Sequence, residues 1–400
     1  MAWKSVEPME ERARFIIEAN EPDRNLSELC RRYCISRKTG YLLLKRYRQE
    51  GMKAVMPQSR RPKRSPSRVS PEAVCAVVSV RSAHPSWGGK KIRAVLLKRR
   101  AAEEVPKVRT IDRILNQCGM VQRRRVRGQR AYHPEAVIRP KEVNEVWTVD
   151  FKGWWRTKDG TRCNPLTIRD EYSKYILDIG ALAESTTEEV MKRFKACFRR
   201  YGVPHYIRSD NGSPFSSSLA LHGLTALSVW WVKAGAIPNR IPKGSPQYNG
   251  AHERMHGDMK KELQFHPARS LALQQDLFDI WREEYNEERP HESLRMETPS
   301  SLYKPSSRMF DTRCKEYLYN DDMLTRKVGV RGEIWWKGRR FFLTNALTHE
   351  TVALREEEEN QYSVWFRNLL LGKTTFEWNK NLRRTRGTDL RNKVLPMSWH

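Results

Sequence analysis

The chain contains the β-rich run Val146-Trp147-Thr148-Val149-Asp150-Phe151, in which one carboxylate interrupts apolar and β-branched residues. Such a run is typical of a buried strand. An isolated carboxylate is costly to bury unless it is paired or binds a metal ion. The run therefore predicts a core strand in which Asp150 has a chemical role.

The segments around this run alternate between strand and helix patterns. Strands are predicted at 165–169, 175–182 and 206–209, and a helix at 187–201. Further helices are predicted at 249–263 and 270–289. Strands interleaved with helices favour an α/β layer, and we assign residues 144–305 to this catalytic core.

Two more acidic residues occupy positions that suit a shared site. Asp210 follows the predicted strand 206–209 and precedes Asn211-Gly212, a turn sequence that exposes a carboxylate at the strand end. Glu253 lies in the first turns of the predicted helix 249–263. Taken singly, Asp-Asn-Gly is a common turn and a helical Glu is commonly solvated. The prediction of catalytic and metal-binding roles rests on Asp150, Asp210 and Glu253 together.

Three carboxylates suit phosphodiester chemistry, which uses two divalent ions roughly 3.5–4 Å apart to stabilise the attacking and leaving oxygens. Carboxylate oxygens are hard ligands, so Mg²⁺ or Mn²⁺ is expected, with two ions per site. Asp150 is expected to bridge the ions, and Asp210 and Glu253 to hold one each. Water or a 3′-hydroxyl is the nucleophile, and no protein nucleophile is required.

The predicted helix 249–263 also carries candidate DNA contacts. Positions 253, 256 and 260 follow helical spacing, so we expect Glu253, His256 and Lys260 to project the same way. Lys260 is then placed to hold a substrate phosphate, although a solvated lysine is an equal alternative. Asn249, His256 and Lys260 are predicted to contact DNA.

The first 56 residues have the spacing of a helix-turn-helix domain. Helices are predicted at 9–20, from Asn25, and after Ser36, which is placed to cap the third helix. Trihelical units also serve as protein-binding modules, but the charged last helix favours DNA. The predicted contacts on it are Arg37, Lys38, Thr39, Tyr41, Lys45 and Arg46.

A basic, proline-containing linker at 57–70 follows, and such arms commonly contact phosphates. Its predicted DNA contacts are Arg60, Arg61, Lys63 and Arg64. Helices expected near 71–82, 89–100 and 106–117 form a second helix-turn-helix-like domain at 71–122. A second basic linker at 123–143 adds Arg123, Arg124 and Arg125 as predicted contacts, or serves as a solvated tether.

The end of the chain is β-rich. Candidate strands at 333–336, 340–343, 351–354 and 362–366 predict a small C-terminal β-barrel of the SH3-like kind at 306–372, followed by a basic tail at 373–400. The expected fold class is thus multidomain, with all-α helix-turn-helix domains, an α/β core and a small β-barrel.

Composition points to a polyanionic partner. The chain has 400 residues, with 75 Lys and Arg against 47 Asp and Glu, a formal net charge of +28. An excess of this size opposes compaction unless a polyanion offsets it, and the basic runs recur along the chain as a long DNA footprint requires. The apolar runs are too short to span a membrane, and the N-terminus does not resemble a signal peptide. A cytoplasmic protein that joins the bacterial nucleoid when bound to DNA is expected.

The seven cysteines are scattered and form no CxxC pair, so neither a zinc site nor a disulfide framework is predicted. Cys30 and Cys34 share a helical face, and we expect both to be small buried core residues.

At these motifs the sequence resembles the integrase-type DDE transposases of bacterial insertion sequences, specifically the IS481-like group that neighbours the IS3 family. The matching blocks are the strand with Trp147 and Asp150, the turn Ser209 to Gly212, the block Pro246 to His256 with Lys260, and Arg289-Pro290-His291, together with Gly40-Tyr41 and Ser59 to Pro62 upstream. The resemblance spans most of the chain, and the block around Glu253 is its most specific part.

The resemblance implies an RNase H-like catalytic core, Mg²⁺ dependence, binding of terminal inverted repeats by the N-terminal helices, and strand transfer into target DNA. Two features depart from related integrases. Asp210 and Glu253 are separated by more residues than is usual there, which suggests a helical insertion around Leu219–Val232. No His/Cys zinc domain precedes the core, so DNA binding falls to the helix-turn-helix units.

Two other functions fit parts of the sequence. A catalytically silent, sequence-specific DNA-binding regulator derived from a transposase would keep the N-terminal domains, but the three carboxylates argue against it. A nuclease that cuts without joining would not need two DNA-reading units. Joining two DNA ends in concert predicts a homo-oligomer on DNA. The inverted-repeat sequence, the target preference and the pathway of excision are not predicted.

Overall fold

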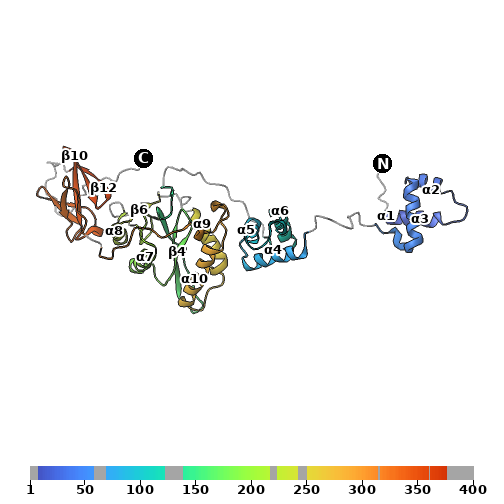
Figure 1. Cartoon of the computed structure of the whole chain (residues 1–400), viewed down its shortest axis with the longest axis horizontal. Coiled ribbons are helices and arrows are strands. Elements are labelled where there is room, and N and C mark those ends of the chain that lie inside the picture. The colour runs from blue at the N-terminus through green and yellow to red at the C-terminus, as the bar shows by residue number, and fades with distance from the viewer. Residues whose placement is uncertain are drawn as a thin grey trace, which may run out of the picture. The chain divides into compact units, whose positions relative to one another are not determined.

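The computed structural model describes residues 8–57, 69–121, 138–216, 223–241, 250–313, 316–359 and 361–375. The chain divides into two compact units, Met1–Val69 and Ser70–His400. Figure 1 shows the helices of the first unit in blue and the elements of the second in the remaining colours. In the described ranges, no helix is long and apolar enough to cross a membrane.

The first unit is a three-helix bundle, as its spacing predicts. Its helices are α1 (Pro8–Ala19), α2 (Leu26–Arg32) and α3 (Arg37–Glu50), followed by the 3₁₀ helix η1 (Gly51–Val55). The Asn25 side chain accepts from Ser27 N, and the Ser36 hydroxyl accepts from Thr39 N, so both predicted caps form. The bundle encloses a core that includes Phe15, Ile16 and Leu43.

One of the two cysteines of this unit differs from the prediction. Cys30 is buried in the core, as expected, but Cys34 is exposed and has a φ of 50°. The reason is that α2 ends at Arg32, so Cys34 belongs to the turn and no longer shares a helical face with Cys30.

The second unit begins with another helical bundle. It comprises α4 (Pro71–Ala83), α5 (Gly89–Arg99), the 3₁₀ helix η2 (Ala102–Glu104) and α6 (Val108–Gln117). Pro71 begins α4 and the Ser70 hydroxyl caps it. The predicted helices therefore form within a residue or two of their expected bounds.

A mixed sheet forms the centre of the second unit. Its strands are β1 (Val146–Phe151), β2 (Trp155–Arg156), β3 (Arg162–Asp170), β4 (Ile176–Leu182), β5 (Tyr206–Ser209) and β6 (Ile237–Arg240). β4, β3 and β1 pair antiparallel, and β5 and β6 join β1 in parallel. The parallel pairs need crossover helices, which α7 (Thr187–Tyr201) and α8 (Ala226–Ala234) supply. This order is that of an RNase H-like core, as expected.

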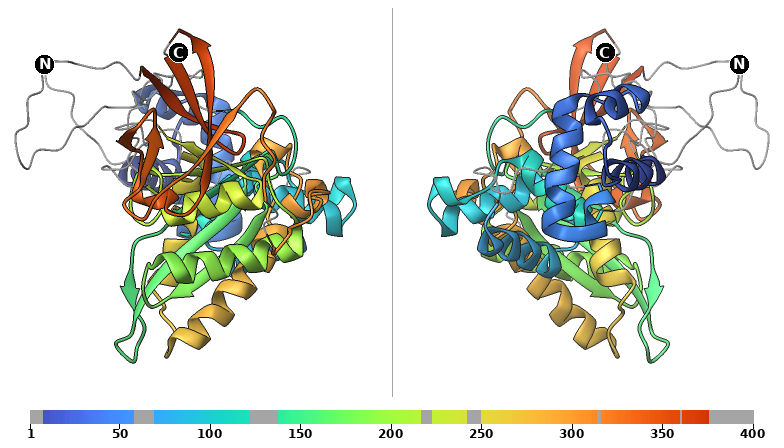
Figure 2. Two further views of the ribbon diagram at one scale, coloured as in Figure 1. Left: turned by 90° about the vertical axis from the view of Figure 1, so that its left-hand side faces the viewer. Right: turned by 90° about the vertical axis from the view of Figure 1, so that its right-hand side faces the viewer.

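Both faces of the sheet are covered by helices (Figure 2). Leu166 and Ile168 of β3 pack with α7 and α8 on one face. Cys163 of the same strand packs on the other face with α9 (Gly250–Met259) and α10 (Leu271–Glu287). The alternation follows from the period of two along a strand. The short helices η7 (Glu292–Leu294) and α11 (Pro299–Leu302) complete this region.

The C-terminal strands form two sheets. β7 (Leu324–Lys327), β10 (Thr351–Glu358), β11 (Gln361–Phe366) and β12 (Leu369–Thr375) make a four-stranded antiparallel sheet. β8 (Glu333–Trp336) and β9 (Arg339–Phe342) make a separate hairpin. The small β-barrel predicted for this region is not shown, since no ladder joins the hairpin to the larger sheet among the described strands. The 3₁₀ helix η8 (Asn345–Leu347) lies between β9 and β10 in the chain.

Candidate active site

Asp150 and Asp210 lie at the carboxyl ends of neighbouring strands. β1 and β5 are parallel neighbours, and Thr148 pairs with Arg208. Asp150 and Asp210 each follow this pair by two residues, Asp210 directly after the end of β5. Paired strands lie about 4.8 Å apart, so the two carboxylates share the carboxyl end of a parallel strand pair. Ligands of open α/β sheets commonly bind at such ends.

The turn after β5 fixes Asp210. Its Oδ1 accepts from Gly212 N at 3.1 Å, and Asn211 Nδ2 donates to the Ile241 carbonyl at 2.7 Å. A Cβ at position 212 would lie 3.1 Å from Asp210 Oδ2, so a larger residue there would have to displace the carboxylate by a few tenths of an ångström. The Asp-Asn-Gly turn therefore presents the carboxylate as the sequence predicts.

Two histidines hold α9 against β3 beside Asp150. The Thr167 hydroxyl lies 2.8 Å from Nε2 of both His252 and His256 and donates to the Asp150 carbonyl at 3.0 Å. The Thr167 hydroxyl therefore links both imidazole rings of α9 to β3, with donor and acceptor roles set by the tautomer of each ring. His252 and Thr167 form part of the site, although the sequence reasoning did not single them out.

His256 also approaches the carboxylate itself, since its Nδ1 lies 3.8 Å from Asp150 Oδ2. Burial, together with the charges of Lys152 and Arg169, lowers the pKa of His256 to about 3, so the ring is neutral at pH 7. A neutral imidazole therefore stands beside the Asp150 carboxylate.

Glu253 and Lys260 are exposed, whereas His256 is buried with an exposed fraction of 6%. The three side chains therefore do not share one exposed surface, as their spacing had suggested. His256 is buried on the side of α9 that carries Met255 and Met259, and its predicted DNA contact stays a prediction. The helix also changes at Lys260, where a π-helical segment, η6 (Lys260–Gln264), begins; such segments are frequent at functional sites.

Lys152 is a second residue that the sequence reasoning missed. It lies two residues after Asp150 and is half-buried. Burial lowers the pKa of Lys152, the charge of Lys260 lowers it further, and Asp150 opposes the change. Lys152 is therefore close enough to both Asp150 and Lys260 to interact with them electrostatically. The i, i+2 spacing from Asp150 along an extended segment is the signal that would have found it.

The donor set fits a hard divalent cation only in part. Asp150 and Asp210 offer carboxylate oxygens at one level, as Mg²⁺ prefers. Among the described residues, however, no group of three or more His, Cys, Asp or Glu side chains is close enough to hold a metal ion. The first turn of α9 carries Glu253, and the chain before it at 242–249 lies outside the described residues.

The predicted DNA contacts of α3 lie mostly on its exposed side. Arg37, Lys38, Thr39, Tyr41 and Lys45 are exposed. Arg46 is half-buried and donates to the Met56 carbonyl at 3.3 Å. The remaining predicted contacts, Arg60, Arg61, Lys63, Arg64, Arg123, Arg124, Arg125 and Asn249, lie outside the described residues.

Family models match four parts of the chain. Two models described as integrase core domain match residues 140–246 and 235–299. A helix-turn-helix domain model matches residues 11–63, and a homeodomain-like domain model matches residues 39–115. The matches therefore cover the two N-terminal bundles and the mixed sheet with its helices.

Proteins of insertion elements are similar over the same part. An uncharacterized protein of IS407 from Burkholderia multivorans is 30% identical over 48% of this chain and 67% of its own length. One of IS476 from Xanthomonas euvesicatoria is 26% identical over 54% of this chain and 60% of its own. One of IS136 from Agrobacterium fabrum is 32% identical over 30% of this chain and 57% of its own. The chain thus spans only 57–67% of these relatives.

Solved structures with a likeness to this chain include the HTLV-2 integrase catalytic core domain in complex with magnesium. It is 17% identical, with a TM-score of 0.32, over 41% of this chain and 99% of that chain. A simian T-cell lymphotropic virus intasome in complex with a PP2A regulatory subunit is 12% identical, with a TM-score of 0.37, over 72% of this chain and 91% of that chain.

The sheet order, the integrase core matches and the IS407 relative agree with one another. This chain belongs to the family of insertion-element proteins that have an integrase core domain and N-terminal helix-turn-helix domains.

Proposed function

We propose that this chain is the transposase of an insertion sequence, of the IS481-like group, and that it binds the element's terminal inverted repeats, cleaves DNA and transfers the strand into a target. The observation that supports the proposal is the parallel pairing of β1 with β5, since Asp150 and Asp210 each follow the Thr148–Arg208 pair by two residues. The contact of His256 with Asp150 supports a role for α9, the helix of Glu253, at the same place.

In the proposed mechanism Asp150, Asp210 and Glu253 hold two Mg²⁺ or Mn²⁺ ions. Such ions, when bound, stabilise the charge on the attacking and leaving oxygens of an in-line displacement. Thr167, His252 and His256 keep α9 and Asp150 in fixed positions. Lys152 and Lys260 supply positive charge near Asp150 for the substrate phosphate.

The proposed DNA path uses the helix-turn-helix domains for the inverted repeats and the basic linkers for phosphates. Joining two ends in concert calls for more than one copy of the chain, so the active form is proposed to be a homo-oligomer on DNA. The proposed location is the bacterial cytoplasm, on the nucleoid.

The test is a Mg²⁺-dependent cleavage and strand-transfer assay on DNA that carries the element's own ends. Glu253→Gln is expected to retain end binding and to lower both activities below roughly 1% of wild type, since loss of even an outer-shell partner costs about 10–100-fold. Glu283→Gln, the same change at an exposed position of α10, is the matched control and is expected to behave as wild type.

Each other outcome assigns a different function. End binding without cleavage or joining by the wild type would indicate the DNA-binding regulator, and cleavage without joining would indicate a nuclease. Full activity of Glu253→Gln would remove Glu253 from the proposed metal ligands.

A further inference from the structure

A small cavity lies beneath the Arg289-Pro290-His291 segment, a motif that the proposed chemistry does not use. It is lined by residues of α5, β3, α9 and α10 and has a volume of about 70 Å³. A cavity needs only roughly 10–15 Å³ to hold one water molecule. There is therefore room for a group of several heavy atoms.

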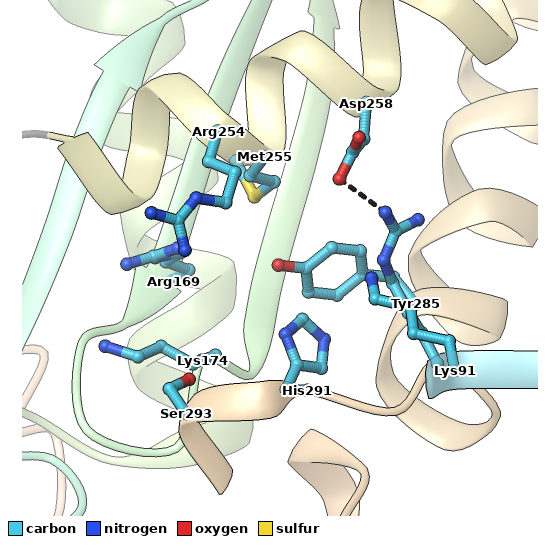
Figure 3. A pocket seen from close by; sticks show the side chains of 10 residues that line it. Lys91, Arg169, Lys174, Arg254, Met255, Asp258, Tyr285, His291 and Ser293 are labelled. Atoms are coloured by element: carbon cyan, nitrogen blue, oxygen red, sulfur yellow. Dashed lines mark hydrogen bonds and ion pairs between the residues drawn. The ribbon is translucent and has the colours of Figure 1, made fainter. Parts of the chain in front are cut away.

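The lining is strongly basic. Five cations face the cavity, and Asp258 is the one carboxylate among the residues that line it (Figure 3). The five are Lys91, Arg169, Lys174, Arg254 and Arg289. They come from four separate segments of the second unit, so the tertiary structure has brought them together.

Neighbouring carboxylates offset only part of this charge. Glu171 pairs with Arg169 and with Lys174, and Arg289 pairs with Asp258 and lies 3.9 Å from Glu262. Glu292 also acts on Lys91, and Asp170 on Arg169, at longer range. Among the described residues, Lys91 and Arg254 have no carboxylate within ion-pair distance, so these two cations of the lining are without an ion pair.

Buried nitrogens of two residues that line the cavity also lack partners. Arg289 Nε, a donor, and His291 Nε2, whose role depends on the tautomer, have no hydrogen-bond partner among the described residues. Arg289 is 2% exposed, so solvent water has little access to form a hydrogen bond with it. The hydroxyl of Tyr285 is directed into the same space (Figure 3). Buried donors of this kind are matched by an acceptor-rich group.

Lys91 is held in an unfavourable charge state by its surroundings. Burial, together with the charge of Arg289, lowers the pKa of Lys91 to about 8, although Asp258, Glu262 and Glu292 oppose the shift. An anion in the cavity would offset both the burial and the repulsion.

The cavity is close to the candidate active site. Arg169 lies two residues from Thr167 on the same face of β3, a separation of roughly 7 Å along an antiparallel strand. Thr167 is the partner of Asp150 in the sheet. A phosphate held by Arg169 would thus lie close to the end of β1 that carries Asp150.

We propose that this cavity binds a phosphate group, either a backbone phosphate of DNA or free inorganic phosphate. A tetrahedral, multiply charged acceptor matches the cations without an ion pair, the unpartnered buried nitrogens and the volume. The DNA source rests on the proposed function, whereas binding of free phosphate does not depend on it.

The experiment uses the full-length protein without divalent metal, so that no DNA cleavage intervenes. In the first arm, inorganic phosphate is titrated at constant ionic strength and binding is followed by calorimetry. Lys91→Met is expected to weaken phosphate binding at least tenfold, as is Arg254→Met, which changes an exposed side chain and is unlikely to disturb folding. Lys98→Met, on the same helix and outside the cavity, is the matched control and is expected to bind as wild type.

In the second arm, duplex DNA binding is measured over a series of KCl concentrations. If a DNA phosphate occupies the cavity, Lys91→Met lowers the slope of log K against log salt by about 1, and inorganic phosphate competes with DNA. If free phosphate is the ligand, the first arm shows the loss and the DNA slope is unchanged. Absence of phosphate binding to the wild type together with an unchanged slope overturns the proposal, whatever the outcome of the cleavage assay.

Discussion

At the scale of single residues, the site depends on groups that carry no charge at pH 7. Thr167 orders two neutral histidines, and their orientation fixes what faces Asp150. The sequence motif around Glu253 contains these histidines but does not say which side of the helix faces the sheet. That choice is made by Met255 and Met259, which bury the same side of α9.

The acid sensitivity of the fold is expected to depend on His291. Burial lowers the pKa of His291 to about 3, with Lys91 adding to the shift, whereas the unfolded chain has the ordinary value of 6.5. Below pH 6.5 His291 binds a proton in the unfolded chain but not in the folded chain. The free energy of unfolding therefore falls as pH falls.

His291→Gln should therefore make this fall shallower between pH 6.5 and 4.5, by at most about 1.4 kcal/mol per pH unit. Denaturant unfolding in phosphate-free buffer measures it. His266→Gln, at an exposed histidine, is the control and should keep the wild-type slope. If His291→Gln instead keeps the wild-type slope of unfolding free energy against pH, the pKa of His291 in the folded chain is not lowered.

At the scale of secondary-structure elements, the close packing of α3 on α2 depends on Gly40. A Cβ at this position would lie 2.6 Å from Cys30 Sγ and 3.1 Å from the Phe15 ring. Helix propensity alone favours alanine by about 1 kcal/mol, but overpacking a core costs about 1–3 kcal/mol.

Gly40→Ala is accordingly expected to destabilise the first bundle by up to about 2 kcal/mol. Hydrogen exchange of α1–α3 in the full chain, which reports local stability, should become faster. Adding Cys30→Ala removes the closest atom and should restore slow exchange. Unchanged exchange in Gly40→Ala would mean that α2 and α3 are not packed this closely.

In the C-terminal region, sequence patterns predicted the strands but not how they pair. The individual strands near 333–336 and 362–366 form as predicted. Strand patterns do not encode which edges pair, however, and the described strands form a four-stranded sheet and a separate hairpin.

At the scale of the whole molecule, the net charge of +28 is expected to dominate the binding of DNA. A protein that makes 6–10 phosphate contacts loses roughly 10³–10⁵ in affinity between 50 and 200 mM salt. We expect a loss in this range for the full chain, measured by fluorescence anisotropy on duplex DNA. As a control, a neutral osmolyte added at 50 mM salt in place of the extra salt should leave the affinity at its 50 mM value. An affinity that does not change between 50 and 200 mM salt would contradict an interface dominated by phosphate contacts.

The sequence by itself determined the elements and the chemistry of the candidate site. Periodicity and caps predicted the bundles, the run containing Asp150 predicted β1, and the Asp-Asn-Gly turn predicted the presentation of Asp210, because each depends on a few adjacent residues. The tertiary structure alone decided the register of β1 with β5, the burial of His256 and the basic cavity at Arg289. These depend on contacts between segments far apart in the chain, which local patterns do not encode.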